Sequence, residues 1–233
     1  MKEAQLVGIH PSMRDARVRG IPFFGPGKIY PVPIEVIEIA PFEIPRHWPR
    51  GFGLDVGYGR TAAIWGALDR DTDILYLYSE HYVAEEQPAV HAAAIMGNGT
   101  EGALRGKWIR GVCDPNAKGR SQRDGISLMQ NYKNLGMDLE IANSAVWAGI
   151  DEVWLRLSSG RLKVFSTLQF FFKEYVLYRR NDKGEIVKKN DHLMDAMRYL
   201  VMSGLSRATT EPLKMEPSYK YPRAITETSW MAS

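Results

Sequence analysis

Short apolar runs mark the middle of the chain, and several alternate with polar residues in the way that predicts half-buried strands. Ile74, Tyr76 and Tyr78, for instance, would share one face of a strand. The predicted strands cover residues 51–57, 61–68, 74–82, 108–113, 138–142 and 162–165. Apolar positions at helical spacing predict helices over residues 85–96, 123–135, 144–157, 167–175 and 191–205. Ser144 is the expected N-cap of the third helix, and Asn190 or Asp191 that of the last.

The order of these elements predicts an α/β fold. Three antiparallel strands joined by tight turns come first, then a helix, then strands that alternate with helices. This order is typical of a ribonuclease H-like core, in which a mixed central sheet of five or more strands is flanked by helices. Such a sheet brings the ends of its first and fourth strands side by side, where a late helix can cross them.

The flanking segments are rich in proline and glycine. In residues 1–49, prolines and glycines separate short β-like runs, such as residues 34–39, and no strong helix is predicted. We interpret them as a linker or as the tail of a preceding domain, without an independent core. Residues 50–208 are the predicted folded domain. Residues 209–233, interrupted by three prolines, are expected to be a loosely packed tail.

Composition narrows the class of protein. With 233 residues, 45% of them hydrophobic and 24% charged, the chain suits one soluble domain with flanking segments. A net charge of +3 permits nucleic-acid binding without requiring it. The single cysteine, Cys113, excludes an intramolecular disulfide and a multi-cysteine zinc site, and its apolar neighbours predict a core position. No apolar run would span a bilayer and no signal-peptide pattern is present, so we expect a cytoplasmic protein.

Three aspartates are the candidates for chemistry. Asp55 follows an apolar run and precedes a glycine-rich turn, Asp114 ends the run over residues 108–113, and Asp195 lies among apolar residues of the last helix. A carboxylate in such a position is costly to bury unless it is paired or binds a metal. Carboxylates brought together favour hard cations such as Mg²⁺ or Mn²⁺. Two such ions, one activating water and one stabilising the leaving oxygen, would cut a phosphodiester bond.

Each acid also has a structural interpretation. Asp55 could be a turn residue, and Asp114 a cap at the end of its strand. Asp191 stands one helical turn before Asp195 and could cap the helix or serve as the third acid. His192 could bind an attacking water or a metal-bound carboxylate, or be an ordinary core or surface histidine.

Basic residues near the predicted turns are candidates for contact with a DNA backbone, although runs of charge are usually solvated surface. They are Lys118, Arg120, Arg123, Arg179, Arg180, Lys183, Lys188 and Lys189. Glu80, near the end of the third strand, is a candidate supporting carboxylate, or only a partner for Lys or Arg. The aromatic residues Phe170, Phe171, Phe172 and Tyr175 are more typical of a core than of a base-stacking surface.

With these residues identified, the chain resembles the nuclease domain of the large terminase subunit of tailed phages, a genome-packaging motor. Three stretches carry the resemblance: Gly-Leu-Asp-Val-Gly-Tyr-Gly at 53–59, Val-Cys-Asp-Pro-Asn at 112–116 and Asp-His-Leu-Met-Asp-Ala-Met-Arg-Tyr at 191–199, the last being the most specific. The resemblance covers roughly residues 50–205. It implies a ribonuclease H-like, metal-dependent endonuclease that cuts concatemeric viral DNA. Asp55, Asp114 and Asp195 would then be the ligands of Mg²⁺ or Mn²⁺, with Asp191 as the alternative third acid.

The resemblance also implies partners and a location. The partners would be double-stranded DNA, the portal protein, a small terminase subunit and an ATPase domain of the same full-length protein. The place would be the host cytoplasm, without a membrane and outside the virion. A large subunit carries a Gly-x-x-x-x-Gly-Lys-Ser/Thr loop, which does not occur here, and Gly-Pro-Gly-Lys at 25–28 is too short a match. We therefore expect the nuclease part of a larger protein, without ATPase activity of its own.

Three other interpretations remain open. An actin-like or sugar-kinase ATPase has a first phosphate loop that residues 54–61 loosely resemble, but it needs a duplicated core, for which this chain is too short. A Holliday-junction resolvase or transposase would use the same carboxylates, and a resolvase would prefer four-way junctions. A non-enzymatic DNA-binding or portal-docking module would have purely structural acids, and metal would not raise its melting temperature.

Overall fold

The computed structural model describes residues 27–57, 59–97, 104–119 and 126–212. Within them, a seven-stranded mixed sheet has the order β2-β8-β5-β4-β3-β6-β7. Its strands are β2 (Glu38–Ile39), β3 (Arg50–Asp55), β4 (Thr61–Asp69), β5 (Ile74–Val83), β6 (Arg110–Cys113), β7 (Leu139–Ile141) and β8 (Leu162–Phe165). The short strands β1 (Gly27–Lys28) and β9 (Arg179–Arg180) pair with each other beside it.

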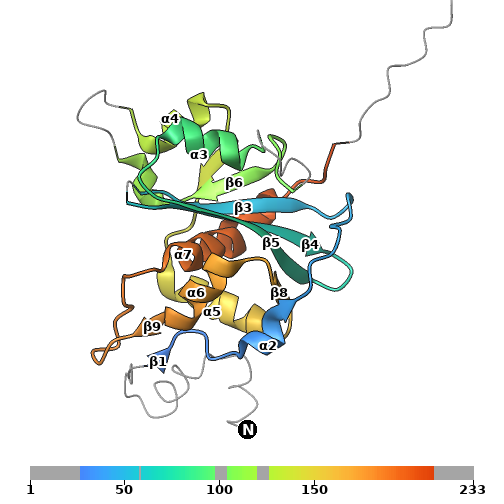
Figure 1. Cartoon of the computed structure of the whole chain (residues 1–233), viewed down its shortest axis with the longest axis vertical. Coiled ribbons are helices and arrows are strands. Elements are labelled where there is room, and N and C mark those ends of the chain that lie inside the picture. The colour runs from blue at the N-terminus through green and yellow to red at the C-terminus, as the bar shows by residue number, and fades with distance from the viewer. Residues whose placement is uncertain (1–26, 58, 98–103, 120–125, 213–233) are drawn as a thin grey trace, which may run out of the picture.

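Helices cover both faces of the sheet (Figure 1). They are α2 (Ile34–Ile37), α3 (Pro88–Ile95), α4 (Leu128–Asn134), α5 (Val146–Ser158), α6 (Gln169–Leu177) and α7 (His192–Tyr199). Figure 1 shows α3 and α4 on one face and α5, α6 and α7 on the other. A 3-10 turn, η2 (Pro115–Lys118), follows β6, while a π-helical turn, η3 (Leu200–Gly204), and η4 (Leu205–Arg207) extend α7. The predicted α/β architecture with a mixed sheet is confirmed.

Strand directions bring the ends of β3 and β6 together. β3, β4 and β5 pair antiparallel, as predicted, whereas β6 runs parallel to β3 with Leu54 opposite Cys113. β7 lies parallel to β6, and β8 lies parallel to β5. Both β3 and β6 therefore end at the same edge of the sheet, as the order of elements predicts.

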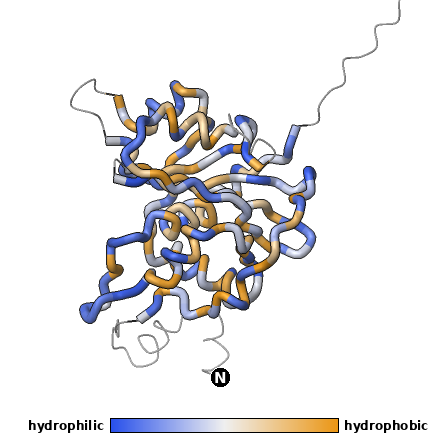
Figure 2. Tube along the Cα trace, in the orientation of Figure 1, coloured by the Kyte–Doolittle hydropathy of each residue, from blue (hydrophilic) through white to orange (hydrophobic). Residues whose placement is uncertain are grey.

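The core lies on both faces of the sheet, because buried residues of α3 and α4 and of α5, α6 and α7 all belong to the main hydrophobic cluster. Trp65 on β4 is fully buried, and Cys113 is 1% exposed, which confirms its predicted place in the core. α7 packs so closely on β3 that a Cβ atom at Gly53 would overlap the carbonyl oxygen of Ala196. Figure 2 shows hydrophobic residues along the strands and a mostly hydrophilic segment between β9 and α7. No helix of the described residues is both long enough and apolar enough to cross a bilayer.

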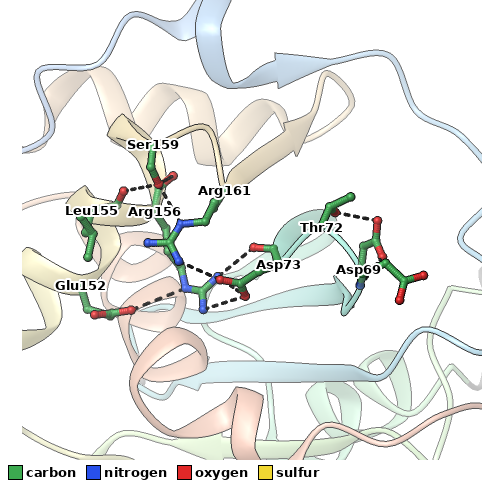
Figure 3. A network of polar contacts seen from close by, with 9 residues as sticks. Asp69, Thr72, Asp73, Glu152, Leu155, Arg156, Ser159 and Arg161 are labelled. Atoms are coloured by element: carbon green, nitrogen blue, oxygen red, sulfur yellow. Dashed lines mark hydrogen bonds and ion pairs between the residues drawn. The ribbon is translucent and has the colours of Figure 1, made fainter.

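An ion-pair network fastens the turn between β4 and β5 to α5 and to the residue just before β8 (Figure 3). The Asp73 carboxylate lies 3.3 Å from the guanidinium of Arg156 and 2.7 Å from that of Arg161. Within the turn, Thr72 donates a hydrogen bond of 2.7 Å to Asp69. The network lies at the end of β4 opposite Thr61, so it holds the sheet far from the ends of β3 and β6.

The segment before β3 belongs to the domain in the described residues. Ile29, Tyr30 and Ile37 are at most 1% exposed and pack in the main core. The β-like run predicted over residues 34–39 forms α2 instead, and only Glu38 and Ile39 pair with β8. At the other end, the backbone of Thr209 exchanges hydrogen bonds of 2.8 and 3.0 Å with that of Arg50. The rest of the predicted tail, residues 213–233, lies outside the described residues.

Several predicted helix starts are wrong by a few residues. The helix expected from residue 85 begins at Pro88, because Glu85 has a positive φ of 53° and proline suits a first helical position. Asn143, and not Ser144, accepts the hydrogen bond from the Ala145 N–H before α5. The helix predicted over residues 123–135 cannot be compared at its start, because residues 123–125 lie outside the described residues.

The aromatic prediction for α6 is correct only in part. Phe171 and Tyr175 are buried in the core, and Phe172 packs partly against it. Phe170 is 43% exposed, because it stands on the outward side of α6. The assignment of Phe170 to the core is therefore wrong.

Candidate metal centre

Asp55 and Asp114 stand at the neighbouring ends of β3 and β6. The last residue pair between these strands is Leu54 on β3 with Cys113 on β6, and each aspartate is the residue that follows. The Asp114 N–H donates a hydrogen bond of 3.0 Å to the Leu54 carbonyl, which ties the two chain segments together at this point. The Asp114 carboxylate accepts a hydrogen bond of 2.9 Å from the Asn116 N–H, so it also caps the turn that follows.

Asp195 comes to the same place from α7, which packs across β3 and β4. It is 9% exposed. One carboxylate oxygen accepts a hydrogen bond of 2.8 Å from Arg198, and the other lies 3.1 Å from the Lys188 ammonium. Arg198 is itself buried and reaches Asp195 because α5 carries Gly149 there, where a Cβ atom would lie 2.5 Å from the Arg198 Cγ.

The acids share one electrostatic environment. Burial raises the pKa of Asp55, and the charges of Asp195 and Asp114 raise it further, against the lowering effect of the His192 hydrogen bond. The pKa of Tyr199 on α7 is raised by burial first, and then by the charges of Asp195, Asp114 and Asp55. The pairing of β3 with β6 places residues 55 and 114 at neighbouring strand ends, and α7, which carries residue 195, packs on both strands. The first and last of these residues are 140 positions apart in the sequence.

His192 contacts Asp55 directly. Its Nδ1 lies 2.8 Å from the Asp55 Oδ2, and its side chain is 36% exposed. The hydrogen bond with Asp55 raises the pKa of His192, while burial opposes that rise. His192 therefore orients the Asp55 carboxylate and stabilises its charge when the imidazole is protonated.

Asp191 lies at the N-cap position of α7, but its side chain makes no capping hydrogen bond. Its Oδ2 lies 3.1 Å from the Lys188 ammonium, which thus bridges Asp191 and Asp195. Burial lowers the pKa of Lys188, but the charges of Asp195 and Asp191 outweigh burial and raise it. A single positive charge therefore lies between these two buried acids.

The carboxylates of Asp55, Asp114 and Asp195 are the kind of ligand that a hard divalent cation prefers, but other residues of the protein bind their oxygens. As they stand, the described side chains include no group of three His, Cys, Asp or Glu that could hold an ion. Lys188 and Arg198 bind Asp195, His192 binds Asp55, and the turn after β6 binds Asp114. The donors are nevertheless all carboxylate oxygens, and their mutual repulsion is what a divalent cation relieves.

Sequence reasoning misses Glu174, which positions the site from α6. Glu174 is 2% exposed and accepts a hydrogen bond of 2.6 Å from the Tyr82 hydroxyl. Its other oxygen accepts a hydrogen bond of 2.6 Å from the Leu193 N–H in the first turn of α7. The only signal in the sequence is one acid within an aromatic helix.

Glu80 does not join the three acids. Its two carboxylate oxygens accept hydrogen bonds of 2.9 and 2.8 Å from the Phe170 and Phe171 N–H groups. Glu80 therefore binds the first turn of α6. This is neither of its expected roles, support for the acids or pairing with Lys or Arg.

The predicted basic contacts lie in different environments. Lys118 is exposed just after Asp114, and Arg179, Lys183 and Lys189 are exposed between the end of α6 and α7. Arg120 and Arg123 lie outside the described residues. Arg180 does not fit a contact with DNA, because it is 5% exposed and its guanidinium lies 5.1 Å from the centre of the Trp147 ring.

Known proteins are similar to this chain in sequence and in fold. The family model described as Terminase RNaseH-like domain matches residues 52–203. The large terminase subunit of Enterobacteria phage LP7 is 32% identical over 218 residues, which cover 88% of this chain and 43% of that protein. That of Salmonella phage P22 is 32% identical over 212 residues, which cover 85% of this chain and 40% of that protein. The chain thus spans less than half the length of either relative.

Solved structures agree with the family match. The nuclease domain of the P22 large terminase has a TM-score of 0.68 at 28% identity, over 81% of this chain and 97% of that one. The nuclease domain of the phage SPP1 large terminase, solved with bound Mn, has the same fold at 18% identity and a TM-score of 0.51, over 72% of this chain and 96% of that one. The chain therefore belongs to the terminase ribonuclease H-like domains, the nuclease domains of terminase large subunits.

Proposed function

We propose that this chain is a metal-dependent DNA endonuclease that cuts concatemeric viral DNA during genome packaging. The observation that carries the proposal is the meeting of Asp55 and Asp114, from two neighbouring strand ends, with Asp195 from α7. Family membership supports nuclease chemistry at this place.

Asp55, Asp114 and Asp195 would hold Mg²⁺ or Mn²⁺, with Asp191 as the alternative third acid. When bound, two such ions would supply an activated water and stabilise the leaving oxygen of the phosphodiester. The Mn bound to the SPP1 nuclease domain supports a divalent ion of this kind.

The neighbouring residues would prepare the acids for this task. His192 orients Asp55, while Arg198 fixes one oxygen of Asp195. Glu174 holds the start of α7, so the acids on α7 keep their place relative to β3. Lys188 offsets part of the negative charge of Asp191 and Asp195, and we propose that it moves away when a divalent cation binds.

The partners follow from the whole terminase and belong to the same proposal. They are double-stranded DNA, the portal protein, a small terminase subunit and an ATPase domain of the same full-length protein, acting in the host cytoplasm. The chain covers 43% and 40% of the two relatives, which leaves room in such a protein for an ATPase domain.

The test is cutting of supercoiled plasmid by the wild type, Asp55→Asn and Asp195→Asn, with Mg²⁺, Mn²⁺ or EDTA. Asparagine is chosen because alanine at 195 would leave the buried Arg198 without its carboxylate partner. We expect metal-dependent cutting by the wild type and a loss of at least about 100-fold in both variants, because even residues that only orient metal ligands contribute 10–100-fold.

Asp71→Asn serves as the matched control, because Asp71 is exposed on the distant turn between β4 and β5. It should cut like the wild type. Cutting that persists in Asp55→Asn at an unchanged rate would contradict the proposal. Cutting lost in Asp55→Asn but kept in Asp195→Asn would assign the third acid to Asp191.

A further inference from the structure

An aromatic pair with a cation at each end lies on the surface beside the acids. The Arg60 guanidinium lies 4.3 Å from the centre of the Tyr82 ring. Tyr82 stacks on Phe170 with ring centres 4.9 Å apart, and the Lys173 ammonium lies 5.1 Å from the centre of the Phe170 ring. These four residues, here called the Phe170 surface, come from the turn after β3, the end of β5 and α6.

The Phe170 surface is continuous with the candidate metal centre. The Tyr82 and His192 ring centres are 6.4 Å apart, and His192 binds Asp55. The Tyr82 hydroxyl binds Glu174, which also binds the start of α7. These contacts fix the Phe170 surface relative to the acids, so a polymer that passes the acids on this side meets it.

Burial does not explain the composition of this surface. Phe170 is 43% exposed, whereas the adjacent Phe171 is fully buried. Lys173 is exposed and Arg60 is half-buried, and neither forms an ion pair with a carboxylate of the described residues. Arg161, in contrast, pairs with an acid at 2.7 Å. Arg60 and Lys173 thus keep their charge available to an external anion.

We propose that Arg60, Phe170 and Lys173 bind the sugar–phosphate backbone of the DNA strand beside the cut site, an inference that rests on the proposed nuclease function. In the absence of metal, three acids repel a phosphate, and cations beside them favour binding of the backbone. Arg60 and Lys173 would each neutralise a phosphate, and the exposed part of Phe170 would pack against a deoxyribose between them. Such contacts hold DNA without reading its bases.

The test measures the affinity of the whole chain for a short fluorescent DNA duplex in EDTA at several salt concentrations. Arg60→Ala and Lys173→Ala should each weaken binding and reduce the slope of log affinity against log salt by about 0.9, as expected for one lost phosphate contact. Phe170→Ala should weaken binding about fivefold, because it removes apolar contact area, and should not change that slope, because it removes no charge. Each effect should be the same for duplexes of different sequence.

Two matched controls lie at distant points. Lys107→Ala removes an equal charge from an exposed site before β6, at the end opposite Asp114. Phe42→Ala removes a ring that is 40% exposed and contacts Tyr76 near the start of β5, far along the strand from Tyr82. Both variants should bind like the wild type.

The outcomes separate this inference from the proposed function. A wild type that cuts plasmid, together with Arg60→Ala and Lys173→Ala variants that keep its affinity and salt slope, would overturn the inference alone. Controls that weaken binding as much as their counterparts would also overturn it. A wild type that neither binds nor cuts DNA would contradict the proposed function as well.

Discussion

Lys188 places one positive charge between Asp191 and Asp195, 3.1 Å from an oxygen of each. Its side chain is 59% exposed, so it can leave this place without opening the core. A cation that binds Asp195 through this oxygen must compete with the Lys188 ammonium. The Lys188 ammonium would therefore lower the affinity of Asp195 for a metal ion by a modest amount.

We predict that Lys188→Ala binds Mn²⁺ more tightly than the wild type, by about fivefold, since an exposed ion pair contributes at most about 1 kcal/mol. Titration calorimetry with Mn²⁺ and no DNA measures this directly. Lys189→Ala, at the exposed neighbouring position, should bind like the wild type. Equal or weaker binding by Lys188→Ala would show that Lys188 does not compete with the ion.

A second titratable feature lies away from the acids, where His81 on β5 meets His91 on α3. The His81 Nε2 and His91 Nδ1 atoms are 2.9 Å apart, and both side chains are buried. Burial, helped by the charges of His91 and Arg105, lowers the pKa of His81 to about 4. The unfolded chain therefore binds a proton below the ordinary pKa of 6.5, while the folded protein does not until about pH 4.

We predict that this difference destabilises the protein as the pH falls from about 6.5 to about 4, by at most about 1.4 kcal/mol per pH unit. His81→Gln should lose this part of the pH dependence. Urea unfolding of both proteins across this range gives the difference, in which the other titrating groups largely cancel. Parallel curves for the two proteins would contradict the prediction.

At the scale of elements, the approach of α7 to β3 determines where Asp195 lies. Gly53 permits that approach, because a side chain there would overlap the backbone of Ala196. We predict that Gly53→Ala lowers the free energy of unfolding by about 1–3 kcal/mol or more, since an overpacked backbone contact cannot relax by a change of rotamer. Urea unfolding measures the loss.

Gly59→Ala is the matched control, because a Cβ atom at Gly59 would meet no atom within 4 Å. It should retain the stability of the wild type within about 0.5 kcal/mol. Equal stability of Gly53→Ala and Gly59→Ala would contradict the close packing of α7 on β3.

Most strands of the central sheet could be predicted, because each apolar run marks its own strand, and the order of elements predicts that the ends of β3 and β6 lie side by side. Asp55 and Asp114 follow apolar runs, and strand order places the ends of such runs together. The roles of Glu174 and Glu80 could not be predicted from the sequence, because their hydrogen-bond partners lie 19 to 92 positions away. The exposure of Phe170 could not be predicted, because an aromatic run does not reveal which of its rings points outward.

At the scale of the whole molecule, the segment before β3 completes the domain. Ile37 is fully buried in α2, whereas its neighbour Val36 is 49% exposed. We predict that Ile37→Ala costs about 2–5 kcal/mol of unfolding free energy, as for other buried large-to-small changes. Val36→Ala, the matched control, should cost about 0.5 kcal/mol or less. Equal effects in urea unfolding would show that this segment is not part of the cooperative unit.

The close contact of Gly149 with Arg198 restricts which residues can occur at position 149 in this family. Arg198 reaches Asp195 by crossing the place that a side chain at position 149 would occupy. A larger residue on α5 would therefore displace the arginine that orients an acid on another helix. Among relatives, position 149 should remain glycine wherever position 198 is arginine, and the two positions should change together.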